Sequence, residues 1–270
     1  MKVRDIEQQF IRLPGMPQME LRSTWDSQQG YKSHSHSQFS IGLLHSGETC
    51  LSCNDDEQKV VAGELVIIEP DRVHACNPVG NGSRGYYMLY IEARWCLQWL
   101  SSFYASGVNH FYCEQTLVRD PQAIDTFVTL VEHLQRQDGQ AIPITLERLA
   151  THLLLPYCSP AEGDRVIDHR CVELKQRLLA DLQNPPTLAD LAAISDCTPE
   201  AVIRMFRRHY GITPKAFVNN ARIEQAKLLL REGVPIVDVA GQLGFFDQSQ
   251  FHRTFVNYTA STPGQYQQSQ

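Results

Sequence analysis

The amino-acid sequence predicts a multidomain α+β protein. Its front part carries short alternating apolar runs separated by Gly, Asn, Asp and Pro, a pattern typical of a small β-barrel or double-sheet roll. Its back part repeats itself at an offset of 48 to 49 residues, with apolar residues at helical spacing. Residues 1–164 carry 12 Lys and Arg against 20 Asp and Glu, whereas residues 165–270 carry 12 against 10. This asymmetry favours a nucleic-acid-binding domain joined to a domain that does not touch nucleic acid.

Composition narrows the class of protein further. The 270 residues are 43% hydrophobic and 20% charged, which suits one large or two modest globular domains. No apolar run approaches the ~20 residues of a membrane helix, and the first residues lack the apolar core of a signal peptide. With eight Cys and no export signal, we expect reduced thiols, a cytoplasmic location and no membrane contact. The sequence shows no Gly-rich phosphate loop, nucleophile elbow or paired-carboxylate motif, so we expect no enzyme.

The front part, residues 1–160, begins with strands and continues with helices. Its clearest strand-like runs between Leu21 and Glu92 are Phe39–Leu43, Gly47–Cys53, Glu64–Ile68 and Tyr86–Ile91, with turns at Asn54–Asp56 and Asn81–Gly82. Helices are expected at Arg94–Tyr104, Pro121–Gln137 and Thr145–Tyr157. The apolar stripes of the last two helices fit either internal core or the surface of a homodimer.

Turn-forming residues mark the end of this part. The stretch Cys158–Asp164 contains Ser159-Pro160 and Glu162-Gly163 and is the expected connection. We place the linker at residues 161–168 and the second domain at residues 169–270.

The first copy of the repeat predicts a helix-turn-helix unit. Thr187 can cap a helix over Leu188–Ile194, and Thr198 can cap a second helix that starts at Pro199 and ends at Gly211. A long helix over Pro214–Arg231 then follows. Its 18 residues span about 27 Å, so two second helices could reach consecutive major-groove segments of one duplex, about 34 Å apart.

The second copy predicts the same unit again. Its first helix runs over Ile236–Leu243, Gly244 makes the turn, and Asp247 caps the second helix. Ala260 stands where the first copy has Gly211, so we expect the last turn of this helix to differ.

The outward faces of the two second helices suit base recognition. Arg can bind guanine through two hydrogen bonds, Gln can pair with adenine, and an apolar side chain can meet a thymine methyl. For one helix alone, the alternative is that these residues form an ordinary solvent-exposed face. An outward Arg stands two residues before an inward Phe in both copies, and this repetition favours DNA binding. The candidate DNA-binding residues are Glu200, Ala201, Ile203, Arg204, Arg207, Arg208, Gln248, Ser249, Gln250, His252 and Arg253. Arg222 and Lys227 of the connecting helix are candidates for phosphate contact.

Residues ~170–266 resemble the AraC/XylS-type bacterial transcription regulators. The resemblance is carried in the second copy by Ile236, Ala240, Gly244-Phe245, Asp247-Gln248-Ser249-Gln250-Phe251, Arg253, Phe255, Thr262-Pro263 and Tyr266. It implies an all-α domain of two helix-turn-helix subdomains joined by a linker helix, which binds promoter double-stranded DNA and contacts RNA polymerase.

The front part resembles a cupin barrel, the effector domain of many such regulators. His34-Ser-His36, Gly47 and the run Gly63…Pro70…His74 carry this resemblance. It implies a cupin-like β-barrel that binds a small-molecule effector near its histidines and neighbouring aromatic rings. The candidate ligand-binding residues are His34, His36, His74, Trp25, Phe39, Tyr87 and Tyr90.

We favour a ligand pocket with no cofactor and no metal. Metal-binding cupins place a Glu four or five residues after the second His, where this chain has Ser40 and Ile41. The alternative is a metal sensor or metalloenzyme in which His34, His36 and His74 hold an ion, completed by Cys53 or Cys76. In a third interpretation the barrel serves only for dimerisation.

Overall fold

The structure is a computed structural model that describes residues 6–53, 56–104, 107–161 and 168–268. Its front part contains β1 (Glu7–Ile11), β2 (Met19–Ser27), β3 (Gln38–Cys53), β4 (Asp56–Val61), β5 (Leu65–Ile68), β6 (His74–Pro78), β7 (Arg84–Glu92), α1 (Ala93–Ser101), β8 (Phe111–Cys113), β9 (Leu117–Val118), α2 (Pro121–Arg136), α3 (Ala141–Tyr157) and β10 (Cys158–Pro160). Its back part contains α4 (His169–Ala180), α5 (Leu188–Ile194), α6 (Pro199–Tyr210), α7 (Pro214–Arg231), α8 (Ile236–Gln242), α9 (Gln248–Thr259) and α10 (Pro263–Gln268). The predicted fold class is confirmed.

The front part is an antiparallel β domain organised by the long strand β3. The first half of β3 pairs with β5 and β7, and its second half pairs with β4 and β6. The sheet continues from β7 through β2 to β1. Because β3 contributes to two sheets, the strands enclose an interior, as the predicted barrel requires.

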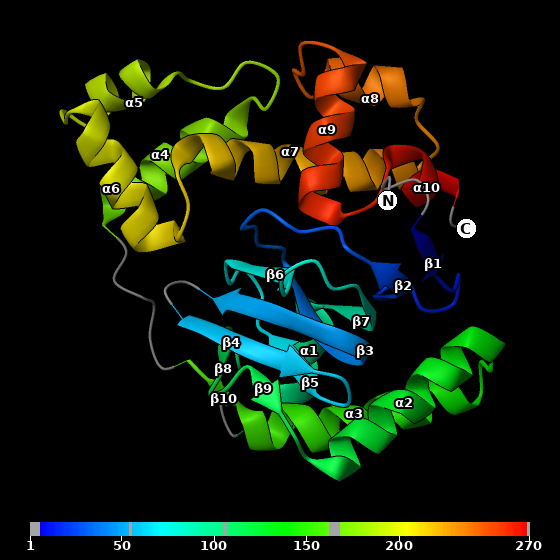
Figure 1. Cartoon of the computed structure of the whole chain (residues 1–270). Coiled ribbons are helices and arrows are strands. Elements are labelled where there is room, and N and C mark those ends of the chain that lie inside the picture. Colours follow the sequence, from blue (N-terminus) through cyan, green and yellow to red (C-terminus); the bar gives the residue numbers. More distant parts are fainter. Residues whose placement is uncertain (1–5, 54–55, 105–106, 162–167, 269–270) are drawn as a thin grey trace.

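Alternation along β3 separates two cores. Phe39, Ile41 and Leu43 face the helices and join the core that contains α1, α2 and α3. Leu44 and Leu51 belong to a second cluster between the two sheets, together with Val60, Val66, Ile68 and Tyr86 of neighbouring strands. The domain therefore has one core below the sheet, where Figure 1 shows α2 and α3, and one inside it.

The strand predictions were correct in place but incomplete. The two runs expected at Phe39–Leu43 and Gly47–Cys53 form one continuous strand. Cys158–Pro160, expected in the domain connection, instead forms β10 and pairs antiparallel with β8, so this segment belongs to the β domain. The rest of the proposed linker, residues 162–167, and part of the turn at Asn54–Asp56 lie outside the described residues.

The back part contains two helical cores that share α7. Val218 of α7 packs in the first core with residues of α4, α5 and α6. Ile223, Ala226 and Leu230 of the same helix pack in the second core with α8, α9 and α10. In Figure 1, α7 runs between α6 and α9, so one rigid helix carries both helix-turn-helix units. Among the described helices, none is long and apolar enough to span a bilayer.

Candidate DNA interface and effector site

The second helix of the first unit, α6, begins and ends as its sequence predicts. The Thr198 hydroxyl accepts a hydrogen bond from the Ala201 N–H, and Pro199 occupies the first turn. Val202 and Phe206 are buried, which turns the opposite side of the helix outward. The outward residues are Glu200, Arg204, Arg207 and Arg208, which are exposed, and Ala201 and Ile203, which are half-buried.

The second helix of the second unit, α9, presents a comparable face. Asp247 accepts from the Gln250 N–H at its start, and Phe251 and Phe255 are buried. Its exposed residues are Gln248, Ser249, Gln250, His252 and Arg253. The Gln250 side-chain oxygen accepts from the Phe246 N–H at 2.8 Å, which leaves its amide NH₂ group for a base.

The turn before α9 requires glycine. Gly244 has φ +68°, and a Cβ added there would lie 2.1 Å from the Gln183 carbonyl oxygen. At the other end of α9 the prediction was wrong: Ala260 takes the same left-handed conformation, φ 51°, that Gly211 takes after α6 with φ 72°. The second helices of the two units therefore end in the same way. Ala260 adopts the left-handed conformation although its Cβ makes this conformation sterically unfavourable.

The two residues of α7 that were candidates for phosphate contact, Arg222 and Lys227, have partners inside the protein. The Arg222 guanidinium donates to the carbonyl oxygens of Leu182 and Gln183 and lies 5.3 Å from the Phe245 ring centre. Lys227 is largely buried, donates to Glu224 and faces the β domain. The structure thus gives both cationic groups partners within the protein, and phosphate contact by either residue stays a prediction.

Three predicted ligand residues form a buried histidine cluster. His34, His36 and His74 each donate Nδ1–H to a backbone carbonyl oxygen, of Lys32, Gln38 and Arg72 respectively. These bonds leave each Nε2 as an acceptor, and the three potential ligand atoms lie within 4.8 Å of one another. Burial lowers the pKa of all three imidazoles, that of His74 to about 4, so they are neutral at pH 7.

This arrangement could hold a metal ion, because neutral imidazoles oriented by carbonyl groups are good ligands. Neither Cys53 nor Cys76 joins the cluster among the residues that the structure describes. Burial raises the pKa of the Cys76 thiol to about 12, which disfavours its thiolate form.

Of the four predicted aromatic residues, only Tyr90 lies at the cluster. Its ring centre is 5.4 Å from that of His36. Phe39 is buried in the core below the sheet, where its ring centre lies 5.7 Å from that of Phe111. Trp25 and Tyr87 flank His45 instead, with ring centres 6.4 and 4.8 Å from it. The structure thus places three of the predicted rings away from the histidines.

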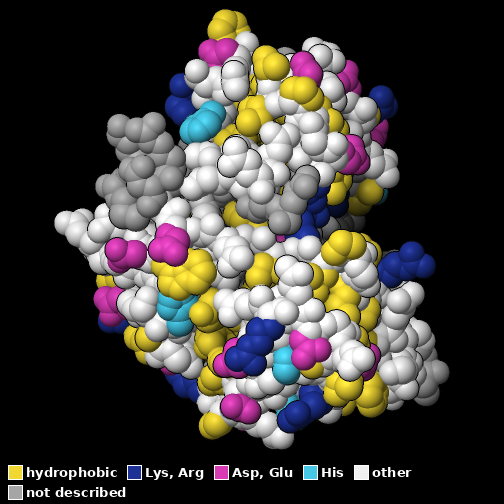
Figure 2. All heavy atoms as spheres, turned by 90° about the vertical axis from the view of Figure 1, so that its right-hand side faces the viewer, with side chains coloured by type: hydrophobic (Ala, Val, Ile, Leu, Met, Phe, Trp, Pro, Cys, Tyr) yellow, Lys and Arg dark blue, Asp and Glu magenta, His cyan; other side chains and the backbone are white. Residues whose placement is uncertain are grey.

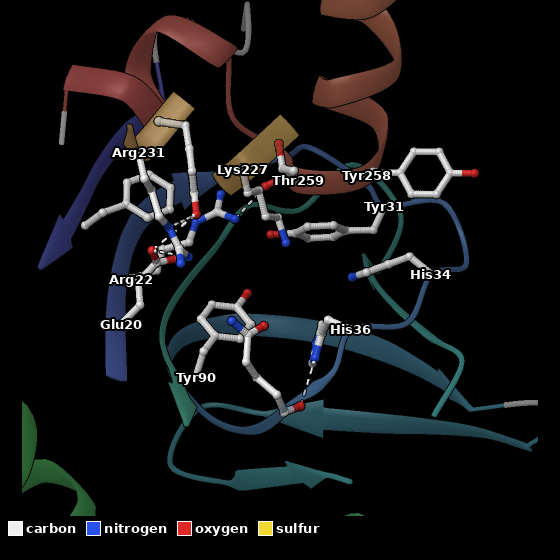
Figure 3. Close-up of a pocket in the computed structure, with 13 residues that line it drawn as sticks. Glu20, Arg22, Tyr31, His34, His36, Tyr90, Lys227, Arg231, Tyr258 and Thr259 are labelled. Atoms are coloured by element: carbon white, nitrogen blue, oxygen red, sulfur yellow. Dashed lines mark hydrogen bonds and ion pairs between the residues drawn. The ribbon is translucent and has the colours of Figure 1, made fainter. Parts of the chain in front are cut away.

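A cavity lies where the β domain meets the second helix-turn-helix unit, and we call it the boundary cavity. It has about 420 Å³ of empty space, counting its open mouth. Figure 3 shows His36 and Tyr90 on the strand side and Lys227 and Thr259 on the helix side. Its lining comprises Phe10, Glu20, Arg22, Tyr31, His34, His36, Gln38, Tyr90, Lys227, Arg231, Tyr258, Thr259 and Tyr266.

The boundary is strongly charged. Arg12, Arg22, Lys227 and Arg231 lie in or beside the cavity and face two carboxylates, Glu20 and Glu224. Figure 2 shows Lys and Arg side chains recessed in the hollow between the helical lobe above and the β domain below. The cavity therefore has a positive surplus of charge.

Side chains from the β domain hold the DNA-binding domain in place. Arg22 of β2 donates to the carbonyl oxygens of Thr259 at 2.5 Å and Ala260 at 3.2 Å, at the end of α9. The Asn220 side chain of α7 accepts from the Ser35 N–H at 3.2 Å and donates to the Ser35 carbonyl at 2.8 Å. Ser35 stands between His34 and His36 in the chain. Its backbone hydrogen bonds therefore link the segment that carries these two histidines to α7, the helix shared by both units.

Arg22 and Asn220, which join the two domains, were missed in the sequence. An Arg inside a strand, as in Leu21-Arg22-Ser23, is a usable signal, since such a charge needs a partner when it is buried. Nothing in the spacing of Asn220 indicates that its partner lies 185 residues away.

Together, the paired recognition helices on a shared helix and the enclosed β domain define a two-domain, ligand-responsive DNA-binding protein. Residues 17–154 match the family described as AraC-like ligand binding domain, and residues 191–269 match a helix-turn-helix domain family. The chain belongs to the AraC family of transcription regulators; it binds DNA through its helix-turn-helix units and has an N-terminal ligand-binding domain.

Several relatives share this organisation. The chain is 32% identical over 228 residues to the RCS-specific HTH-type transcriptional activator RclR of Escherichia coli, covering 76% of this chain and 75% of that protein. It is 24% identical over 240 residues to the arabinose operon regulatory protein of Salmonella typhimurium, covering 84% and 82%. A crystal structure of ToxT from Vibrio cholerae has the same fold, with a TM-score of 0.56 at 12% identity, covering 97% of this chain and 96% of that one.

Proposed function

We propose that a small molecule bound beside the histidine cluster tightens promoter binding by changing how the β domain holds α7 and α9. The observation that carries this proposal is the boundary cavity, whose walls come from both domains. A ligand there contacts the two domains at once, so its affinity depends on their arrangement. Such a difference in affinity is what couples an effector to DNA binding.

Two contacts supply the connection. A ligand that displaces His34 or His36 also displaces Ser35, and the paired hydrogen bonds of Ser35 move with Asn220 of α7. A ligand that contacts Arg22 acts on the end of α9 through Thr259. Both helices position base-reading side chains, so a small change at the cavity reaches the DNA interface.

The test uses the full chain and an operator obtained by binding-site selection. Compounds that raise the thermal stability of the protein are then added to operator-binding assays. We expect at least one to raise operator affinity about 5-fold or more, within the usual range of allosteric coupling. If no stabilising compound changes operator affinity, the proposal is wrong.

A variant pair tests the connection through Asn220. Asn220→Ala removes both hydrogen bonds to Ser35 and should reduce the effect of the ligand on operator affinity. Asn219→Ala, one position away on α7, is the matched control, since no hydrogen bond of the Asn219 side chain occurs within the described part of the chain. An equal effect of both variants would show that Ser35 does not transmit the signal.

The proposal includes contact with RNA polymerase at the promoter and a homodimer. The apolar stripes of α2 and α3 are internal core here, since Phe127, Leu130 and Leu149 are buried between the helices and the sheet. A homodimer formed through these helices would therefore use their outer faces, where Ile144 is exposed. Analytical ultracentrifugation tests the dimer, and in vitro transcription with purified polymerase tests the promoter contact.

A second candidate is a metal-dependent effector site. The observation that favours it is the set of three neutral imidazoles whose potential ligand atoms lie within 4.8 Å of one another. Elemental analysis of the purified protein tests it: one equivalent of zinc or another transition metal, lost in His36→Gln, would support a metal site. A metal-free protein with full response to its effector would exclude it.

A further inference from the structure

We propose that the interior of the β domain binds a small molecule through a carboxylate that pairs with Arg84. This inference rests on the proposed function and names the chemical class of the effector. The site is a second cavity, between the two sheets, which we call the inner cavity. It shares Tyr31, His34 and Tyr90 with the boundary cavity.

Arg84 is a buried cation with an unused hydrogen-bond donor. It lines the inner cavity, and only 1% of its surface is exposed. Its Nη2 donates to the carbonyl oxygens of Gln29 at 3.1 Å and Cys76 at 2.8 Å. Its Nη1 has no hydrogen-bond partner in the structure, although it is out of reach of water. Buried guanidinium groups of this kind normally have an acceptor for each nitrogen.

No charge in its surroundings balances Arg84. Among the residues that the structure describes, no carboxylate lies within ion-pair distance of its guanidinium. The neighbouring titratable groups are neutral at pH 7, because burial raises the pKa of the Cys76 thiol and of the Tyr31 hydroxyl and lowers that of His34 and His74. The ring centres of Tyr86 and Tyr31 lie 5.6 and 6.0 Å from the guanidinium carbon, which stabilises a cation but does not neutralise it.

A carboxylate suits the Arg84 guanidinium better than a neutral group does. The guanidinium is planar and offers parallel donors that match two carboxylate oxygens, and the low dielectric of the interior strengthens such a pair. The anion would supply both the missing charge and an acceptor for Nη1. A neutral ligand supplies only the acceptor.

The walls of the inner cavity indicate an apolar body attached to that carboxylate. Leu44, Val60, Val66 and Met88 are among the apolar residues that line it. Its empty space is about 560 Å³ counting its open mouth. Gly42 and Met88 shape one wall, since a Cβ on Gly42 would lie 2.7 Å from the Met88 methyl group. A short aliphatic or aromatic acid suits these apolar walls.

Occupation of the inner cavity also reaches the DNA-binding domain. His34 lines both cavities and precedes Ser35, which is hydrogen-bonded to Asn220 of α7. An acid beside Arg84 that contacts His34 therefore acts on the same connection that the proposed function requires.

The decisive experiment compares each acid with its own amide. Isothermal titration calorimetry on the wild-type full chain at pH 7 uses benzoate and the saturated monocarboxylates from butyrate to octanoate, each beside its primary amide. Because losing the charge of a buried pair is expensive, the best acid should bind at least about 30-fold more tightly than its amide. If the amides bind as tightly as the acids, or no acid binds at millimolar concentration, the inference is overturned.

Further probes and variants locate the site. Inorganic phosphate and phenyl phosphate should bind more weakly than the acids, and tighter binding of either would overturn the assignment to carboxylates. Arg84→Lys keeps the charge but loses the planar pair of donors, so we expect at least about 10-fold weaker acid binding. Arg136→Lys, an exposed residue paired with Glu132, is the matched control and should bind acids like the wild type.

A variant outside the charged group tests the apolar wall. Met88→Ala lengthens the cavity, so the preferred acid should gain one or two methylene groups. An unchanged preference would contradict binding at this wall. This measurement, like the comparison of acids with amides, does not depend on the folding of an Arg84 variant.

The same titrations separate the two proposals. If a neutral compound binds the β domain and raises operator affinity, the proposed function holds and the carboxylate inference fails. If acids bind through Arg84 but leave operator affinity unchanged, the inference holds and the proposed function fails.

Discussion

Replacing Glu20 by Gln is expected to loosen the second helix-turn-helix unit from the β domain. The Glu20 side chain is 9% exposed and accepts from Arg231 at 2.8 Å, from Arg12 and from the Tyr266 hydroxyl at 3.3 Å. Glutamine keeps the shape of the side chain but removes the only negative charge that both Arg12 and Arg231 contact among the described residues. The variant thus removes a counter-charge that two cations share at the domain boundary.

The expected magnitude follows from the burial of these groups. Removing one partner of a fully buried ion pair costs about 3–5 kcal/mol. Arg231 and Arg12 are 29% and 20% exposed, so solvent screens part of this penalty and we expect a loss of about 2–3 kcal/mol. Hydrogen exchange at the amides of α7 and α10 should accelerate about 30- to 150-fold, and urea should unfold the domain at lower concentration.

The pH dependence provides a second measurement. Burial alone would raise the pKa of Glu20, but the charges of Arg231 and Arg12 outweigh it and lower the pKa below 4.5. Its stabilisation is therefore complete above pH 4.5 and is lost as the pH falls through the lowered value. Glu20→Gln should lack this acid step. Glu132→Gln, which breaks an exposed pair with Arg136, is the control and should change stability by less than about 0.5 kcal/mol. If Glu20→Gln also falls within that limit and keeps the acid step, the reasoning is refuted.

Further predictions concern the DNA interface, the turn and the histidines. Arg204→Ala and Arg253→Ala should each weaken operator binding by about 1–3 kcal/mol and relax base preference at one position in a binding-site selection; a uniform loss on all sequences would contradict base contact. Gly244→Ala should lower the free energy of unfolding in urea by about 2–5 kcal/mol because its Cβ would meet backbone, whereas Gly241→Ala, with open space around it, should be neutral or slightly stabilising; similar losses would disprove the steric explanation. The pKa of His74 is about 4 in the folded state and about 6.5 in the unfolded chain. The unfolded chain therefore binds a proton more readily, and the free energy of unfolding should decline as the pH falls from about 6.5 toward 4. His74→Gln should flatten this part of a profile of Tm against pH, and an unchanged slope would count against it.

The DNA-binding domain could be predicted from the sequence in unusual detail because its signals are local. Thr198 and Asp247 cap the helices that they were expected to cap, and α7 begins at Pro214 and ends at Arg231 as expected. Capping, proline placement and helical periodicity act over a few residues, so each can be recognised in the chain itself. The prediction for Ala260 failed because a tertiary contact from Arg22 holds the end of α9, and no local pattern encodes that contact.

The effector region was only partly predictable. His34, His36 and His74 could be grouped because their motifs predicted them on two strands. The structure brings them together, although His34 and His36 precede β3. Phe39 and Tyr87 could not be assigned to a face from alternation alone, since each side of this sheet is covered by a core or a cavity. Arg84 was missed because its significance lies in the absence of a partner, which only the three-dimensional arrangement reveals.

Phe10 of β1 has a consequence for how this regulator can be divided. Its ring packs inside the core of the second helix-turn-helix unit, with its centre 5.2 Å from that of Tyr266. Cutting the chain at the domain connection would therefore remove the Phe10 ring from this core. The carboxy-terminal fragment would then have a cavity and newly exposed apolar side chains. Swapping sensory modules between relatives would meet the same obstacle, because the physical unit that reads DNA includes a residue from the beginning of the chain.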